Sequence, residues 1–140
     1  MFKATQAIYS ALKASKLELK VFTDENEAQS FVWLQFTAKN GSPYRIQFIS
    51  RDDDNDVAVR IFSLIHVESS QIEKVLPAIN AVNSKFRYTK FVIDNDGDIN
   101  VEYDFLVRAA NVEECAEEIV IRFVKIIDEA YPVLMHALWS

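Results

Sequence analysis

The sequence has few of the residues on which common catalytic motifs depend. Its 140 residues include two glycines, Gly41 and Gly97, one cysteine and two histidines. Dinucleotide-binding fingerprints, Walker A loops and kinase glycine-rich loops each need two or three closely spaced glycines, so the sequence excludes them. A single cysteine excludes a disulfide framework and a cysteine-rich zinc site. The two histidines lie 70 positions apart and leave little for a histidine-based metal site.

Long apolar runs are missing as well. No stretch approaches the ~20 apolar residues that a membrane-spanning helix requires, and residues 1–16 lack the apolar centre of a secretory signal. We therefore expect no membrane segment and a cytoplasmic location, which the single unpaired thiol also suits. The length fits one domain spanning residues 1–140, large enough to bury an ordinary hydrophobic core.

Basic residues are outnumbered by acidic ones, 15 to 21, which gives a net charge of −6. The excess lies in residues 91–140, which hold eleven acidic and three basic side chains. Phosphate recognition depends on clustered Lys and Arg, so we expect neither nucleic acid nor an anionic membrane as a partner. An acidic domain with exposed apolar patches is instead a candidate for binding another protein.

The spacing of apolar residues predicts three helices and six strands. Helical spacing covers residues 2–15, a second segment that begins at a capping box of Ser70 and Glu73, and a third that begins at Asn111. Pro77 and Pro132 are expected to kink or break the second and third helices. Alternating patterns predict strands at residues 17–22, 31–39, 44–49, 57–67, 86–94 and 99–107.

The resulting element order is α-β-β-β-β-α-β-β-α. The helices are too few to lie between successive strands, so we expect an α+β fold with a mainly antiparallel sheet and helices packed against it. Both glycines fall in turn signals, Asn40-Gly41-Ser42-Pro43 and Asn95-Asp96-Gly97-Asp98. Neither glycine is left over for a catalytic or cofactor-binding loop.

Two acidic loops invite comparison with calcium-binding loops. One contains Asp94, Asp96 and Asp98, and the other contains Asp52, Asp54 and Asp56. An EF-hand loop needs glycine at position 6 and glutamate at position 12. The first loop has Ile99 and Phe105 at these positions, and the second has Val57 and Ser63. A hairpin turn and a solvated loop are the favoured interpretations, and a small-ligand or divalent-cation site at these loops is the alternative hypothesis.

Cys115 is the only cysteine of the sequence and therefore its one candidate thiol nucleophile. A histidine could activate it, but His136 lies about 30 Å further along a continuous helix, and the distance to His66, on a predicted strand, does not follow from the sequence. No third orienting group can be named, so a structural cysteine is favoured. We therefore predict no enzymatic activity, no cofactor and no metal site.

Apolar residues exceed what one small sheet needs to cover. The strand at residues 31–36 is apolar on both faces, and the last helix continues with further apolar residues to the end of the chain. Exposed patches of this kind mark interfaces, whereas coverage of both sheet faces within the chain is the alternative. The predicted interface residues are Ile79, Val82, Phe86, Leu138 and Trp139.

The segment from Phe86 to Phe105 resembles the central hairpin of the YbjN-like family, small bacterial proteins often called sensory transduction regulators. In that family a helix ending in Asn leads through a basic-aromatic strand into an Asp-rich glycine turn. A strand ending like Glu102-Tyr103-Asp104 and a long C-terminal helix follow. Asn83-Ser84-Lys85 and the helix from Asn111 fit this order. The resemblance covers residues 70–138 well, and residues 1–69 agree in element order only.

The resemblance implies a sandwich similar in fold to the dimeric class I chaperones of type III secretion. It also implies a homodimer with a protein-binding role, chaperone-like or regulatory, and supplies no enzymatic motif. The length before the second helix, and Pro77 within it, depart from the simple chaperone pattern. Our hypothesis is a non-enzymatic, homodimeric protein-binding module whose protein partner the sequence does not identify.

Overall fold

The computed structural model describes residues 1–39, 41–52, 55–109 and 111–140. These residues form one six-stranded antiparallel sheet and three α-helices, which confirms the α+β class and the predicted element order. The helices are α1 (Lys3–Lys13), α2 (Ile72–Lys85) and α3 (Val112–Trp139). The strands are β1 (Phe22–Glu25), β2 (Ser30–Thr37), β3 (Pro43–Ser50), β4 (Asp56–His66), β5 (Lys90–Ile93) and β6 (Asp98–Leu106).

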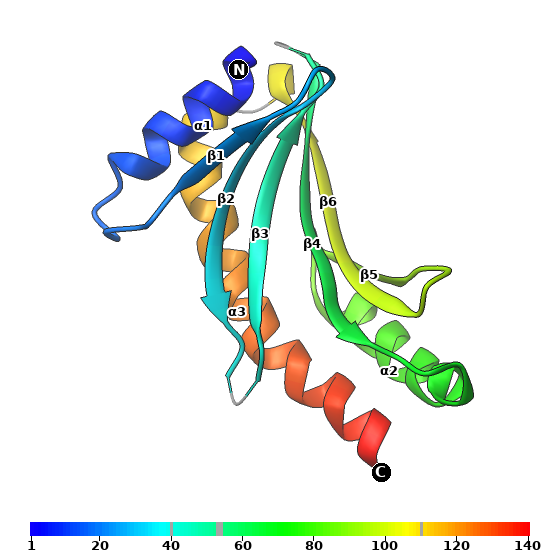
Figure 1. Cartoon of the computed structure of the whole chain (residues 1–140). Coiled ribbons are helices and arrows are strands. Elements are labelled where there is room, and N and C mark those ends of the chain that lie inside the picture. The colour runs from blue at the N-terminus through cyan, green and yellow to red at the C-terminus, as the bar shows by residue number, and fades with distance from the viewer. Residues whose placement is uncertain (40, 53–54, 110) are drawn as a thin grey trace.

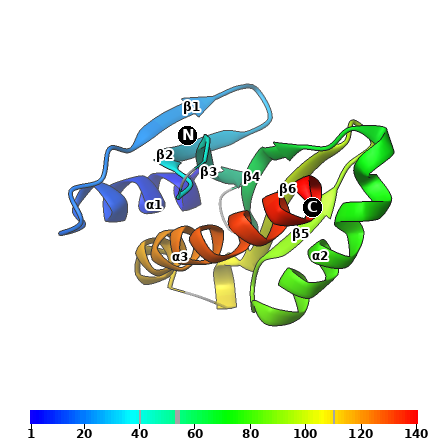
Figure 2. The same ribbon diagram turned by 90° about the horizontal axis from the view of Figure 1, so that it is seen from below.

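The sheet has the strand order β1-β2-β3-β4-β6-β5, and the helices lie together behind it (Figure 1). Seen from below, the sheet bends so that β1–β3 and β4–β6 form two wings, with α3 running under them (Figure 2). The wings are joined where Gln47–Ser50 of β3 pairs with Val57–Arg60 of β4. The long helix α3 contacts both α1 and α2, so it ties the helical layer together.

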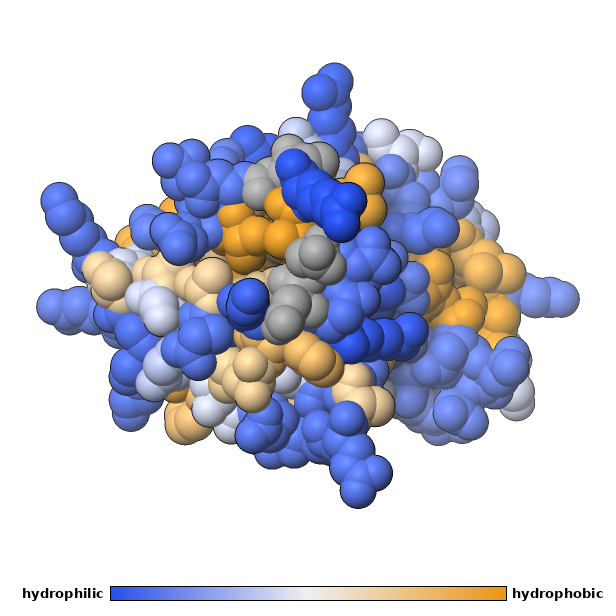
Figure 3. Space-filling model, turned by 90° about the horizontal axis from the view of Figure 1, so that it is seen from above, coloured by the Kyte–Doolittle hydropathy of each residue, from blue (hydrophilic) through white to orange (hydrophobic). Residues whose placement is uncertain are grey.

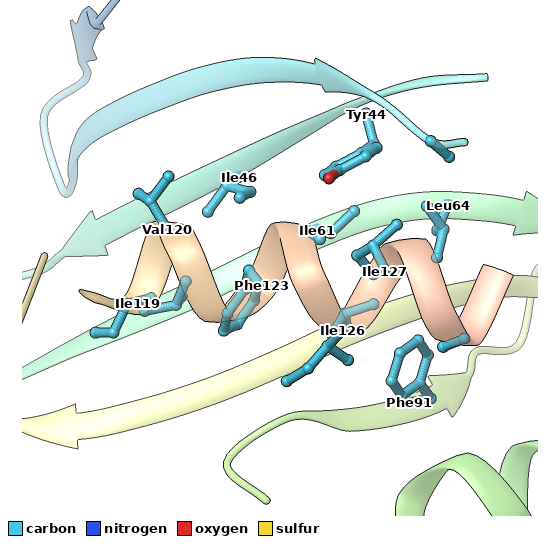
Figure 4. Close-up of a cluster of buried hydrophobic side chains, with 14 of the residues drawn as sticks. Tyr44, Ile46, Ile61, Leu64, Phe91, Ile119, Val120, Phe123, Ile126 and Ile127 are labelled. Carbon is cyan, nitrogen blue, oxygen red and sulfur yellow. The ribbon is translucent and has the colours of Figure 1, made fainter. Parts of the chain in front are cut away.

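The core lies between α3 and the helix-facing side of the sheet. Alternation along the strands places Val32, Phe48 and Val59 on this side, and each of them is fully buried. One stripe of α3, which includes Val120, Phe123 and Ile127, points toward the strands (Figure 4). Because these side chains share one core, the helical layer and the sheet stabilise each other.

Neither proline breaks its helix. Both α2 and α3 run on through Pro77 and Pro132, so an expected break at either proline is wrong, whereas a kink there stays a prediction. A proline removes one backbone hydrogen bond and frees the carbonyl four residues earlier. Both prolines lie on the exposed side of their helices, where water can hydrate that carbonyl.

Helix starts were predicted correctly in one case and wrongly in another. Asn111 caps α3, since its Oδ1 accepts hydrogen bonds from the N–H groups of Glu113 and Glu114 at 3.1 and 3.2 Å. Ser70 does not cap α2, because it lies in the 3₁₀ turn η1 (Ser69–Gln71) that precedes the helix. The apolar spacing of this helix is confirmed at Val75, Ile79 and Val82, which are buried, but not at Leu76, which is exposed.

Two strand predictions also need correction. Residues 17–21 are not in a strand, and β1 begins at Phe22 because its pairing with Trp33 of β2 sets the register. Alternation along residues 57–67 predicts Ser63 on the apolar face of β4, and this is wrong because the pairing with β6 shifts between Ile61 and Ile65. Ser63 takes a positive φ of 53° at this bulge and is exposed.

The two predicted glycine turns differ in outcome. The turn at Gly97 is present with a φ of 84°, and Asn40 of the other turn lies outside the described residues.

The surface mixes hydrophilic and hydrophobic side chains. From the end of the molecule at which the N-terminus lies, hydrophobic patches are visible between hydrophilic side chains (Figure 3). Across the described ranges, no helix combines the length and the hydropathy needed to cross a bilayer.

Candidate functional site

The acidic turn between β5 and β6 holds its own backbone in place. The Asp94 Oδ1 atom accepts hydrogen bonds from the N–H groups of Asp96 and Asp98 at 2.9 and 3.0 Å. Its Oδ2 atom accepts from the Asn100 side chain at 2.9 Å. The backbone N–H of Asp98, followed by the Asn100 amide, lowers the pKa of Asp94. Both carboxylate oxygens of Asp94 therefore stabilise the hairpin turn.

A neighbouring cluster joins β4 to β6 at the bulge. One oxygen of Asp98 lies 2.9 Å from His66 Nδ1, and the other accepts a hydrogen bond from Ser63 Oγ at 3.0 Å. The hydrogen bond to Asp98 raises the pKa of His66. Ser63 and His66 thus contact different oxygens of one carboxylate rather than forming a nucleophile–base pair. The backbone N–H of Ser63 donates to Asn100 Oδ1 at 2.8 Å, which fixes the bulge.

The other sequence candidates are not assembled into a reaction centre. Asp52 accepts a hydrogen bond from the N–H of Asn55 at 2.8 Å, and Asp54 lies outside the described residues. Cys115 and His136 lie on one unbroken helix, about 30 Å apart by helical rise. Within the described parts of the chain, no group of three or more His, Cys, Asp or Glu side chains is placed to hold a metal ion.

The five predicted interface residues lie along α2, just after its C-terminal end and in the last turn of α3. Ile79, Val82 and Leu138 are buried within the chain, and Phe86 is half-buried. Trp139 has 79% of its surface exposed. Gln71 donates a hydrogen bond to the Leu138 carbonyl at 3.2 Å, which holds the last turn of α3 beside the start of α2. Trp139 is therefore the member of this set most accessible to a second molecule.

The open face of the sheet carries a surface that the sequence did not single out. All three helices lie on the other side, so within the described residues this face has no covering layer (Figure 1). Cross-strand pairing places Phe22 beside Trp33, and Trp33 beside Gln47. Phe62 and Leu106, which are 50% and 59% exposed, follow the same alternation on β4 and β6.

Three residues of this face form a compact cluster, the aromatic–cation stack. The rings of Phe22 and Trp33 are stacked, with centroids 4.3 Å apart and planes inclined by 17°. The guanidinium carbon of Arg45 lies 3.9 Å from the centroid of the Trp33 ring. Stacking on an aromatic ring orients a guanidinium while leaving its N–H groups free to donate. The stack therefore presents apolar surface and a directed positive charge together.

A second cation on the open face is already paired. Arg60 contacts Asp104 at 2.7 Å, and its side chain is only 18% exposed. Arg45, by contrast, contacts no carboxylate among the residues that the structure describes. Of the two arginines, Arg45 is therefore the one available to a carboxylate from outside the chain.

One signal for the open face was present in the sequence. The strand at residues 31–36 is apolar on both sides, and the structure shows that helices bury only one of them. Phe22 gave no signal, because its strand was predicted to end there. Arg45 gave none either, because its position diagonal to Trp33 depends on the register between β2 and β3.

The chain was compared with protein families, curated proteins and solved structures. The model of the YbjN family, described as "Putative bacterial sensory transduction regulator", matches residues 6–135. No curated protein matches the chain, and no solved structure matches it. The family match extends over the N-terminal half, where the sequence alone showed agreement in element order only. The likeness to type III secretion chaperones stays a prediction.

Proposed function

Because the chain belongs to the YbjN family, we propose that it is a non-enzymatic regulator that acts by binding another protein through the open face of its sheet. The observation that carries this proposal is the aromatic–cation stack of Phe22, Trp33 and Arg45 on an uncovered sheet face. Exposed aromatic and arginine side chains in one patch are typical of the energetic centre of protein interfaces.

The chemistry of the stack indicates the kind of partner. Phe22 and Trp33 offer apolar surface. Arg45 offers N–H donors, and no carboxylate among the described residues contacts them. A partner that places an apolar side chain beside an Asp or Glu would satisfy both features. The proposed partner is therefore a protein with an acidic, apolar contact segment.

Reversing the charge of Arg45 is expected to weaken partner binding strongly. In parallel affinity captures from the native organism, wild-type protein should enrich a partner protein. Arg45→Glu should capture at least about tenfold less of this partner, because a buried interfacial charge pair is worth about 1.4 kcal/mol or more. Lys125→Glu, at an exposed position of α3 on the other side of the sheet, is the matched control and should retain the partner. Equal capture by the wild type and Arg45→Glu would contradict the proposal.

A spectroscopic titration locates the contact. In a Trp139→Phe background, Trp33 is the remaining tryptophan, so the purified partner should change the emission of Trp33 with saturation. The partner's contact segment should also be acidic. An unchanged emission spectrum at saturating partner would place the contact elsewhere on the molecule.

We also propose that the protein is a homodimer, with Trp139 at the contact between two copies. An exposed tryptophan at the end of an ordered helix is a common anchor of interfaces. Light scattering at micromolar concentration is expected to give about twice the chain mass of 16.1 kDa, and Trp139→Ala should lower this value toward the mass of one chain. Ile121→Ala, which truncates another exposed apolar residue of α3, is the control. A wild-type protein of single-chain mass would overturn the dimer.

A further inference from the structure

The outer edge of β6 has no neighbouring strand beyond the point where β5 begins. The last pair between the two strands is Lys90 with Glu102, and β6 continues from there to Leu106. β5 lies beside only the part of β6 that is close to their shared turn (Figure 1). An open strand edge is a template for pairing with another chain, and proteins normally cover it.

The backbone groups of Asp104 point outward from this edge. Along an antiparallel strand, the N–H and carbonyl groups of successive residues point to opposite sides. Those of Phe91 point away from β6, because they bond to Asn83. Those of Glu102, opposite Lys90, therefore point toward β5, and those of Asp104, two residues later, point past its end. Within the described ranges, no strand lies there to receive them.

A strained turn keeps the preceding chain away from this edge. Tyr88 has a φ of 74°, and the N–H of Thr89 donates to the Arg87 carbonyl across it at 2.9 Å. These features describe the rare form of γ-turn, which is strained for a residue other than glycine. The turn leads the chain into β5 without strand pairing to Tyr103, whose ring meets that of Tyr88 edge to face at 5.7 Å. Residues 103–106 of β6 are thereby left open to a second chain.

A groove, here called the β6 groove, lies between this part of β6 and α3 on the helical side of the sheet. Its apolar floor consists of four side chains that are almost fully buried, Phe105, Ile119, Phe123 and Ile126. The last three lie on the face of α3 that points toward the strands (Figure 4). Tyr88 and Arg122 at its rim are exposed, so the groove is open to solvent, and Arg122 is paired with Glu118 at 2.7 Å. Every second side chain of a strand added to β6 would point into this groove.

The charges beside the β6 groove favour a basic partner. The Asp104 carboxylate is 61% exposed at the open edge, and its contact with Arg60 uses one of its two oxygens. Four glutamates adjoin the groove on α3, where Glu118 borders it: Glu113, Glu114, Glu117 and Glu118. The exposed cations Arg87 and Lys90 lie at the other end, where β5 begins. A second copy would bring the same carboxylates against each other, so self-pairing at this edge is disfavoured.

From this geometry we propose that the open edge of β6 binds an extended peptide in which apolar residues alternate with Lys or Arg. The peptide would add a strand beside residues 103–106 and form backbone hydrogen bonds with Asp104. Its apolar side chains would enter the β6 groove, and a Lys or Arg opposite Asp104 would meet that carboxylate. This site does not depend on the proposed open-face binding, which uses the stack on β1–β3.

A short peptide and the single cysteine of the chain test the proposal. The probe is the capped peptide Lys-Ile-Lys-Ile-Lys, which is long enough to span residues 103–106. Cys115 lines the groove and is partly accessible, so its rate of modification by a thiol-specific disulfide reagent reports on occupancy. We expect saturable protection with a Kd of about 100 μM or lower. At ten times its Kd, the peptide should slow the reaction about tenfold, because only the unoccupied fraction reacts. The peptide Glu-Ile-Glu-Ile-Glu should bind at least about tenfold more weakly.

Variants of the peptide and of the protein separate strand addition from other contacts. Only every second N–H group of an added strand faces β6. A methyl group on the central Lys nitrogen or on the adjacent Ile nitrogen should therefore raise the Kd at least about fivefold in one case and less than about twofold in the other.

Asp104→Asn removes the carboxylate with little change in shape and should raise the Kd about threefold or more. Asp24→Asn on β1, at the other edge of the sheet, is the matched control, and Arg45→Glu tests the open face separately. Both should leave the Kd within about twofold of the wild-type value. Absence of saturable protection, equal binding of the acidic peptide, equal effects of the two methyl groups, or an unchanged Kd in Asp104→Asn would each overturn the proposal.

Discussion

Replacing Asn83 with alanine is expected to lower the free energy of unfolding by about 2–4 kcal/mol, since two buried backbone groups each lose a partner worth roughly 1–3 kcal/mol. The Asn83 side chain accepts a hydrogen bond from the Phe91 N–H at 2.7 Å and donates one to the Phe91 carbonyl at 2.9 Å. Phe91 lies on β5, the last strand of the sheet, and is 1% exposed. The amide thus replaces the strand that this edge lacks.

Urea denaturation at one fixed protein concentration is the appropriate measurement, because self-association would shift the transition. Asn80→Ala on the exposed side of α2 is the control, and its effect should stay within about 0.5 kcal/mol. Asn83→Asp keeps the acceptor but loses the donor, and its carboxylate faces the Phe91 carbonyl. It should therefore be at least as unstable as Asn83→Ala at neutral pH. An Asn83→Ala protein of wild-type stability would show that water replaces the amide.

This contact gives a physical reason for one element of the family resemblance. The asparagine at the end of the second helix was noted in the sequence as part of a motif, without a role. In the structure it connects α2 to the edge strand of the hairpin. The motif therefore describes a packing arrangement between two adjacent elements.

The features predicted correctly from the sequence are those with local causes. The asparagine cap of α3 depends on residues 111–114, and the turn at Gly97 depends on four consecutive residues. The apolar stripes of the helices depend on spacing within one segment. In each case the residues that determine the structure are close neighbours in the chain.

The features missed depend on residues far apart. The bulge at Ser63 needs Asn100 and Asp98 of another strand. The strand at residues 31–36 has two apolar faces, and its sequence does not indicate which one the helices cover. Likewise, the turn at Tyr88 is strained alone, and contacts with Tyr103 and Arg122 stabilise it. The candidate surface and the β6 groove both arise from such long-range contacts, so neither could be predicted residue by residue.

Substituting Gly97 with alanine is expected to destabilise the fold by about 2–3 kcal/mol, because a non-glycine residue at this φ is strained by roughly 1–3 kcal/mol and its methyl group meets fixed backbone. The φ of Gly97 is 84°, and an added Cβ would lie 2.5 Å from the carbonyl oxygen of Val67. The Val67 backbone has little room to move, since its N–H donates to the Gly97 carbonyl at 2.7 Å and the residue is 1% exposed.

Thermal unfolding of Gly97→Ala and Gly97→Asn distinguishes the two causes. Asparagine tolerates a positive φ better than alanine does, but its Cβ occupies the same position. If backbone strain dominates, Gly97→Asn should recover much of the lost stability, whereas a dominant contact with Val67 should leave both variants equally unstable. Asn95→Ala, an exposed substitution in the same turn, should change stability by less than about 0.5 kcal/mol. A Gly97→Ala protein as stable as the wild type would mean that the turn can move away from Val67 at no cost in free energy. The side chains of Ser63, His66 and Asp98 at the bulge would then keep their arrangement without help from this turn.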